Sequence, residues 1–262
     1  MNPNSTASLS LEGARDWLSR WDTQQDRYIE RREERFAVIG DLLAATCRAD
    51  AKILDLACGP GSLGARLAER FPKAQVVGVD YDPVLLAIAR TAHREDPRRR
   101  FLESDLRLSG WWKDEAPASF DAVVSTTALH WLGSHELVRV YREAARLLRP
   151  GGVLVNGDHV APAPGEQALA RVVARSREQM HVEADARGAA TWEGWWDAIA
   201  HDATFAGAWE ERGRRFGARH GEEPITLAYH LAALRQAGFE ETGVAWQRWD
   251  DVVMFGTVAG RA

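Results

Sequence analysis

Short apolar runs alternate with amphipathic stretches through the first 159 residues. The segment 11–47 mixes aromatic and aliphatic side chains with many charges at roughly helical recurrence, which predicts helix. Five apolar runs follow and predict strands at 52–57, 75–79, 100–103, 121–125 and 153–156. Helices are predicted between them at 62–70, 82–93 and 136–148, with a turn at 149–152. Strands that alternate with helices predict right-handed βαβ units and a parallel sheet.

The alternation stops after Asp158 and resumes near the end of the chain. Residues 160–222 contain helical stretches but no clear strand. A helix is predicted over 226–237, closed by Gly238. Two strands follow, at 241–248 and 252–258, and the turn between them is so short that it permits only an antiparallel pair.

These elements predict an α/β fold: a Rossmann-like, doubly wound, mostly parallel seven-stranded sheet with an antiparallel C-terminal strand. We expect an N-terminal helical cap at 1–48. The core is expected at 49–159 and 223–262, and a helical lid insertion at 160–222.

Composition narrows the classes of partner. The net charge of −5 argues against a general nucleic-acid binder, which normally carries a basic excess. No run approaches the roughly 20 apolar residues of a membrane span, and the N-terminus lacks an apolar signal core. Cys47 and Cys58 cannot form a disulfide framework or a clustered zinc site. We therefore expect a cytoplasmic protein with a small-molecule substrate and neither a nucleic-acid nor a membrane partner.

A glycine-rich loop lies between the first predicted strand and its helix. Residues 59–64 read Gly-Pro-Gly-Ser-Leu-Gly, and glycines there let a ligand approach free amides at a helix N-terminus. Asp80 ends the next strand, 21 residues after Gly59, where a carboxylate can accept both hydroxyl hydrogens of a ribose. The same pattern matches the dinucleotide fingerprint, so an NAD-dependent oxidoreductase stays open at this point.

Three features favour a different ligand. Asp55 lies inside the first strand, where it suits a cationic amino group and sulfonium better than a pyrophosphate. Asp105 ends the third strand, where an acid can accept a hydrogen bond from an adenine amino group. The C-terminal antiparallel strand pair is the third feature.

The segment 53–61, Ile-Leu-Asp-Leu-Ala-Cys-Gly-Pro-Gly, resembles motif I of the class I S-adenosylmethionine-dependent methyltransferases. Further motifs of that family are similar to Val-Gly-Val-Asp at 77–80, Glu-Ser-Asp-Leu at 103–106, Phe-Asp-Ala-Val-Val-Ser at 120–125 and Leu-Arg-Pro-Gly-Gly at 148–152. The resemblance spans about residues 50–160 and 226–258, and it says almost nothing about the methyl acceptor.

The resemblance implies that S-adenosyl-L-methionine is the cofactor and S-adenosyl-L-homocysteine its product. Its implied binding residues are Ala57, Gly59 and Gly61 for the methionine part with Asp55 nearby, Asp80 for the ribose, Tyr81, Asp105 and Leu106 for the adenine, Thr126 and Thr127 under the sulfonium, and Tyr28 on an N-terminal segment that closes over the cofactor.

Two histidines are candidates for the chemistry. His130 follows the fourth strand, at the end that faces the reactive methyl group in this fold, and it can act as a base or orient the substrate. His159 follows the fifth strand and is a second candidate. Each can instead be a hydrogen-bonded structural histidine. The sequence Ser125-Thr126-Thr127, where nitrogen-modifying members often have Asn-Pro-Pro, disfavours an amino acceptor or a DNA base.

The insertion is expected to form the acceptor pocket. Trp192, Trp195 and Trp196 share one helical face and, with Trp131, form a candidate substrate wall, although core packing is the favoured explanation for at least two of the three on that face. Nearby arginines could hold a substrate carboxylate or form a solvated face: Arg212, Arg214, Arg215 and Arg219. His159, His220 and His230 support a metal site only weakly, and none is assigned.

The sequence thus predicts methyl transfer from S-adenosylmethionine to an oxygen or carbon of a small natural product or organic acid. The alternatives are an NAD-dependent oxidoreductase, an RNA methyltransferase, and a regulatory protein that retains the cofactor fold.

Overall fold

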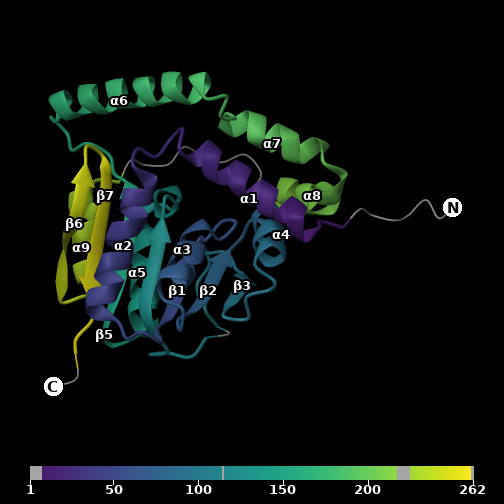
Figure 1. The fold of residues 1–262 in the computed structure, drawn as a ribbon. Coiled ribbons are helices and arrows are strands. Elements are labelled where there is room, and N and C mark those ends of the chain that lie inside the picture. Colours follow the sequence, from purple (N-terminus) through teal and green to yellow (C-terminus); the bar gives the residue numbers. More distant parts are fainter. Residues whose placement is uncertain (1–7, 114, 217–224, 261–262) are drawn as a thin grey trace.

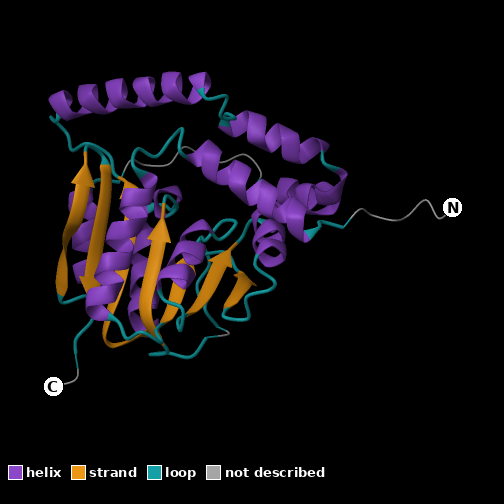
Figure 2. Ribbon diagram, viewed as in Figure 1, coloured by secondary structure: helices purple, strands orange, loops and turns teal. Residues whose placement is uncertain are grey.

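A computed structural model describes residues 8–113, 115–216 and 225–260, and its centre is one seven-stranded sheet (Figure 2). The strands are β1 (Lys52–Leu56), β2 (Gln75–Asp80), β3 (Arg99–Glu103), β4 (Phe120–Thr126), β5 (Leu148–His159), β6 (Glu241–Arg248) and β7 (Asp251–Thr257). Their order is β3-β2-β1-β4-β5-β7-β6, and β7 runs antiparallel to both of its neighbours. The predicted fold class is confirmed.

Most helices begin and end within a few residues of the bounds predicted from the sequence. They are α1 (Leu11–Gln25), α2 (Arg32–Thr46), α3 (Ser62–Arg70), α4 (Pro83–Ala92), α5 (Ser134–Leu147), α6 (Gln167–Ala186), α7 (Trp192–His201), α8 (Ala206–Arg215) and α9 (Leu227–Ala237), with 3₁₀ turns at Leu129–Trp131 and Ala203–Phe205. Asp82 caps α4 through the amides of Val84 and Leu85, and Gly238 ends α9 in the left-handed conformation. Within the described residues, no helix is long and apolar enough to cross a membrane.

Each face of the sheet is covered by helices. Phe36, Ile39 and Leu43 of α2 pack with α3 against one face, together with Ile53 and Val155. The opposite face packs against α5 and α9 through Leu137, Val140, Tyr141 and Leu234. Strands buried on both faces explain the continuous apolar runs of the sequence.

The helices of the insertion lie beyond the carboxyl ends of the parallel strands, together with α1 (Figure 1). Trp17 and Trp21 of α1 pack edge to face against Trp195 of α7, with ring centroids 5.5 and 5.0 Å apart. The segment 1–48, expected as one cap, therefore contains two different helices: α1 packs with the insertion, whereas α2 is part of the layer on the sheet. We propose that the cap consists of α1 and the insertion.

The expected turn at 149–152 is a distortion inside β5. Leu148 pairs with Phe120, and the next pair along the ladder is Val153 with Ala122. The chain between them bulges, with Gly151 at φ +77°. Arg149-Pro150-Gly151-Gly152 thus distorts the strand instead of preceding it.

Gly78 in β2 has no room for a side chain, which gives a test of this packing. A Cβ atom there would lie 2.7 Å from Cys58 Sγ and 2.8 Å from Phe101 Cδ1. We expect Gly78→Ala to lower the free energy of unfolding by about 1–3 kcal/mol, measured by urea denaturation. Gly207→Ala is the matched control, because no atom lies within 4 Å of the added methyl group and alanine favours helix. Equal stability of the two variants would contradict this picture of β2.

Candidate functional site

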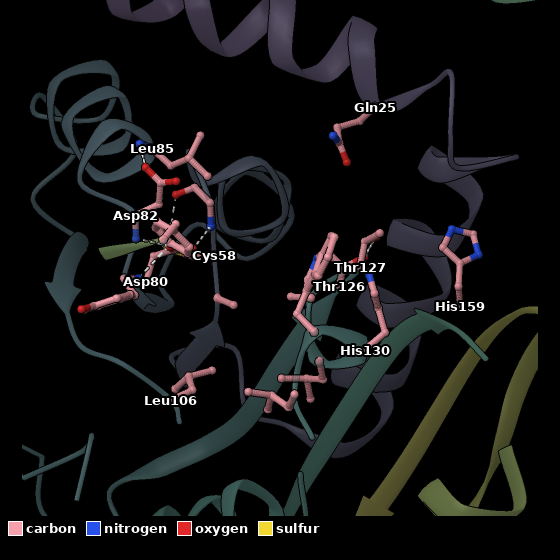
Figure 3. Close-up of a pocket in the computed structure, with 18 of the residues that line it drawn as sticks. Gln25, Cys58, Asp80, Asp82, Leu85, Leu106, Thr126, Thr127, His130 and His159 are labelled. Atoms are coloured by element: carbon pink, nitrogen blue, oxygen red, sulfur yellow. Dashed lines mark hydrogen bonds between the residues drawn. The ribbon is translucent and has the colours of Figure 1, made fainter. Parts of the chain in front are cut away.

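A cavity of about 1360 Å³ opens where β1, β2, β4 and β5 end. Figure 3 shows Cys58, Asp80 and Asp82 on one side and Thr126, Thr127 and His130 on the other, with Gln25 of α1 above them. Ligands in open α/β sheets bind at such carboxyl ends, where the connections diverge. The site is therefore built from loops that the sheet positions and from helices that cover them.

The glycine-rich loop forms one wall. Ala57, Gly59 and Gly61 all have positive φ values, of +50°, +55° and +90°, which turn the chain sharply into α3. Ala57 and Gly59 line the cavity, whereas Gly61 does not. A Cβ atom on Gly61 would lie 2.9 Å from His93 Nε2, so glycine is needed there for packing as well as for φ.

Asp80 supports this loop and lines the same wall. One carboxylate oxygen accepts from the Gly59 amide at 2.7 Å, and the other from the amides of Tyr81 and Asp82 at 2.7 and 2.8 Å. Burial raises the pKa of Asp80 to about 6 in spite of these donors. A carboxylate so placed can exchange part of this bonding for the hydroxyls of a ligand.

Asp55 is not among the residues that line the cavity. Its carboxyl group is buried beneath α3, and a Cβ atom on Gly64 would lie 3.4 Å from its Oδ2. Burial raises the pKa of Asp55 to about 8, so the group is mostly protonated at neutral pH. The structure thus places Asp55 behind the wall rather than on it.

Tyr81, Asp105 and Leu106, the residues predicted for an adenine subsite, all line the cavity. Asp105 forms a bidentate ion pair with Arg107, with 2.7 Å between Oδ2 and Nη2. Burial alone would raise the pKa of Asp105, but the guanidinium outweighs it and holds the pKa below its ordinary value. Asp105 therefore offers a charged acceptor that Arg107 already occupies in part.

Thr126 and Thr127 line the cavity next to His130 (Figure 3). Thr127 has φ +52°, a strained conformation for a β-branched residue. Its hydroxyl lies 2.6 Å from Arg35 Nη1, and the same guanidinium nitrogen reaches the carbonyl of Gly157 at 3.2 Å. Arg35 is fully buried and ion-paired with Asp251. Sequence reasoning missed Arg35, because one arginine on a charged helix gives no sign of facing the sheet.

His130 is held by a second residue that sequence reasoning missed. Its Nδ1 lies 2.6 Å from Asp158 Oδ1, and its backbone amide donates to Asp158 Oδ2 at 3.1 Å. Burial alone would raise the pKa of Asp158, but the charge and hydrogen bond of His130 lower it well below its ordinary value. A carboxylate on Nδ1 fixes the ring so that Nε2 points away from Asp158.

His159 lies beyond His130 on the same side of the cavity (Figure 3). Its Nδ1 is buried, has no hydrogen-bond partner among the described residues, and lies 3.7 Å from Asp250. Burial and the charge of Arg35 lower the pKa of His159 to about 4, so the ring is neutral at pH 7. Asp250 also pairs with Arg177 of α6, which lines the cavity.

The predicted aromatic wall is partly present. Trp192, Trp196 and Trp131 line the cavity, but Trp195 is only 1% exposed and packs in the aromatic cluster with α1. Tyr28 lines the cavity, and its hydroxyl accepts from the Trp192 amide at 2.8 Å. Tyr28 therefore connects the α1–α2 segment to the start of α7.

Two arginines of α8 bind acidic residues at the rim of the cavity. Arg212 donates to Asp82 at 2.7 Å and its guanidinium stacks 3.7 Å over the Trp196 ring. Arg215 pairs with Glu103 at 2.6 Å. Arg214 pairs with Glu210 and Glu211 on the surface, and Arg219 lies outside the described residues. Arg212 and Arg215 line the cavity, but acids of the protein already bind both.

No cluster of metal-binding side chains occurs in the described part of the chain. His230 is buried against the Tyr141 hydroxyl at 2.8 Å, and His220 lies outside the described residues.

Comparison with known proteins agrees with this geometry. Residues 53–152 match a family model described as a methyltransferase domain. The chain is 40% identical over 135 residues to a trans-aconitate 2-methyltransferase of Azoarcus sp. (strain BH72), an alignment that covers 51% of this chain and 49% of that relative. The chain thus spans about half the length of this curated relative.

A longer alignment joins the chain to a trans-aconitate 2-methyltransferase of Acidovorax sp. (strain JS42). The two are 31% identical over 194 residues, which cover 72% of this chain and 70% of the relative. Among solved structures, a TehB-like S-adenosylmethionine-dependent methyltransferase from Corynebacterium glutamicum superposes with a TM-score of 0.52 at 17% identity, over 95% of this chain and 98% of that one. The last likeness concerns the fold alone.

Proposed function

Because the chain belongs to the class I S-adenosylmethionine-dependent methyltransferases, we propose that it transfers the methyl group of that cofactor to an oxygen atom of a small organic acid. The observation that carries the proposal is a set of basic side chains in the part of the cavity around His130, which we call the acceptor half: His130, His159, Arg177 and His181. Such a wall suits an anion. The trans-aconitate methyltransferase relatives support the same class of acceptor.

The residues of the other half fit the cofactor. The left-handed turn at Ala57 and Gly59 brings backbone to the cavity surface, and Asp80 supplies a carboxylate for two ribose hydroxyls. Leu106 and the Tyr81 ring offer apolar surface for an adenine. When bound, S-adenosylmethionine supplies a methyl carbon made electrophilic by its positive sulfur. This fit favours the methyl donor over NAD.

If the acceptor is a carboxylate, the protein needs no general base for the reaction. Its oxygen is already anionic, so no proton has to be removed, and the protein must hold it in line and exclude water. The cover formed by α1, α7 and α8 can exclude water, and Thr126 and Thr127 fix the floor. Arg177 and His159 can hold the acceptor from the other side.

The proposal is tested by offering a panel of small carboxylic and hydroxy acids with radiolabelled S-adenosylmethionine. We expect label in the extractable ester from at least one acid. Transfer to RNA but to no acid would contradict the proposal.

Asp80 gives a pH-dependent prediction for cofactor binding. The ribose hydroxyls need an ionised acceptor, and with a pKa of about 6 Asp80 loses its charge as the pH falls below that value. We expect the Kd for S-adenosylhomocysteine, measured by calorimetry, to rise below pH 6 by up to about tenfold per pH unit. Asp80→Asn is expected to bind at least about tenfold more weakly at pH 7.5 and to lose this pH dependence. An unchanged slope in the variant would refute the assignment.

A hydroxyl acceptor is the second candidate, and the His130–Asp158 pair favours it. A neutral His130 could take the hydroxyl proton on Nε2 while Asp158 stabilises the resulting charge, as in other histidine–carboxylate pairs. The same pair can orient a carboxylate instead, through a hydrogen bond from the charged ring. The two acceptors therefore differ in what they demand of Asp158.

Asp158→Asn separates the two candidates. With a hydroxyl acceptor we expect kcat to fall by about 10²–10⁴, because general base catalysis is lost. With a carboxylate acceptor we expect a fall of less than about tenfold, because no proton moves. The Kd for S-adenosylhomocysteine and the Tm serve as controls for folding. A large loss of kcat with an acid that has no hydroxyl group would contradict the carboxylate mechanism.

A further inference from the structure

A second cavity, of about 450 Å³, continues from the acceptor half of the site beneath α6. His130, His159 and Arg177 line both cavities, so the two meet at these side chains. The remaining lining residues are Val160, Ala161, Pro162, Ala170, Val173, Ala174, Ile225 and Asp250. We call this space the side cavity. Apart from the three shared side chains, its lining belongs to none of the subsites assigned above.

The walls of the side cavity are apolar. Val160, Val173 and Ile225 are 6–8% exposed and form its buried part. On α6 the lining residues recur at i, i+3, i+4 and i+7, from Ala170 to Arg177, which is one face of a helix. Three small or branched apolar residues on this face are followed by one arginine at the end nearest the main cavity. A ligand with an apolar chain and an anionic head matches that order.

The junction supplies partners for the head group. Arg177 reaches it from α6 and is shared with Asp250. His159 lines both cavities, and its buried Nδ1 has no hydrogen-bond partner among the described residues. A neutral imidazole can donate one hydrogen bond to a carboxylate. An acid placed here would satisfy His159 and compete with Asp250 for Arg177.

From these observations we infer that the acceptor is a carboxylic acid with an apolar chain, whose carboxylate lies at the junction and whose chain fills the side cavity. This inference rests on the proposed function and names its substrate class. In the reaction a carboxylate oxygen forms the new bond to the methyl carbon, the carbon–sulfur bond breaks, and its electron pair stays on sulfur. The products are a methyl ester and S-adenosylhomocysteine, and no proton is released.

The apolar lining of the side cavity favours a monocarboxylic acid over an acid with several charges. A tricarboxylate that entered the side cavity would place a further charge among Val160, Val173 and Ile225, and burying a charge without a partner is costly. A straight-chain monocarboxylate buries methylene groups there instead. The specificity of the chain should therefore differ from that in the printed name of the trans-aconitate methyltransferases.

The first experiment measures kcat/KM for ester formation with straight-chain acids from butanoic to decanoic, and with trans-aconitate. We expect kcat/KM to rise about fourfold for each methylene buried until the cavity is full, and trans-aconitate to be a poorer substrate than the best chain acid. Equal rates along the series, or a preference for trans-aconitate, would overturn the inference while the proposed function stands. Ester from no acid, although S-adenosylhomocysteine binds, would defeat both.

The second experiment fills the cavity. Val173→Trp should remove the chain-length preference, lowering kcat/KM for the longest acids at least tenfold and for butanoic acid little. Ala168→Trp is the matched control, because residue 168 is exposed and lies about half a turn away from the lining face of α6. The Tm and the Kd for S-adenosylhomocysteine report on folding. Ala174→Leu replaces Val173→Trp if the larger residue does not fold.

The outcomes of this experiment are distinct. Loss confined to the long acids in the filled variants supports the inference. An equal loss for every acid would show that α6 acts only as a cover, and an unchanged chain-length profile would show that the chain binds elsewhere. Either result overturns the side cavity as the chain site.

Discussion

The buried guanidinium of Arg35 is the constraint on which the site depends. It is fully inaccessible to water, and a charge in that position is tolerated only if an opposite charge pairs with it. Its partners come from three strands: Thr126 and Thr127 at the end of β4, the Gly157 carbonyl of β5, and Asp251 at the start of β7. Removing either member of such a buried pair typically lowers the free energy of unfolding by about 3–5 kcal/mol. The pair therefore fixes the position of α2 relative to the ends of the three strands.

The contacts of Arg35 also shape the cavity near His130. The bond from Arg35 helps to hold Thr127 at its positive φ, and the chain then turns through the 3₁₀ segment that presents His130. Gly157 must be a glycine, because a Cβ atom there would lie 2.8 Å from Arg35 Cδ. Asp158 follows directly and holds the imidazole. Arg35, which lies outside the cofactor motifs, thus helps to position Thr127 and the residues that follow Gly157. These segments flank the point where we propose that the methyl group is transferred.

The fold could be predicted because its signals are local. An apolar run, a proline after Asp82 and a glycine after Ala237 each specify their own backbone, and most strands and helices lie within a few residues of the predicted bounds. Most residues predicted for the cofactor line the cavity, but Gly61 and Asp55 do not. For Asp55 the reason is the pleat of β1, which decides the face of the sheet that carries its side chain. Arg35 and Asp158 could not be predicted as site residues. Their role depends on partners 92 and 28 residues away, and side chains of their kind usually lie on the surface.

In the acceptor half, the helical spacing of apolar residues does not show which of them pack against the protein and which line the cavity. Trp195 and Trp196 lie on the same predicted face of α7, yet one is packed against α1 and the other lines the cavity. On α6 the face from Ala170 to Arg177 has the spacing of a packing stripe, but it borders a cavity. An apolar helix face has the same sequence pattern whether a neighbouring helix or a substrate covers it. The reason is that removing apolar side chains from water is favourable in both cases. What distinguishes them is whether another element of the fold reaches that face, and over the side cavity Val160 and Ile225 come close enough to form walls without filling it.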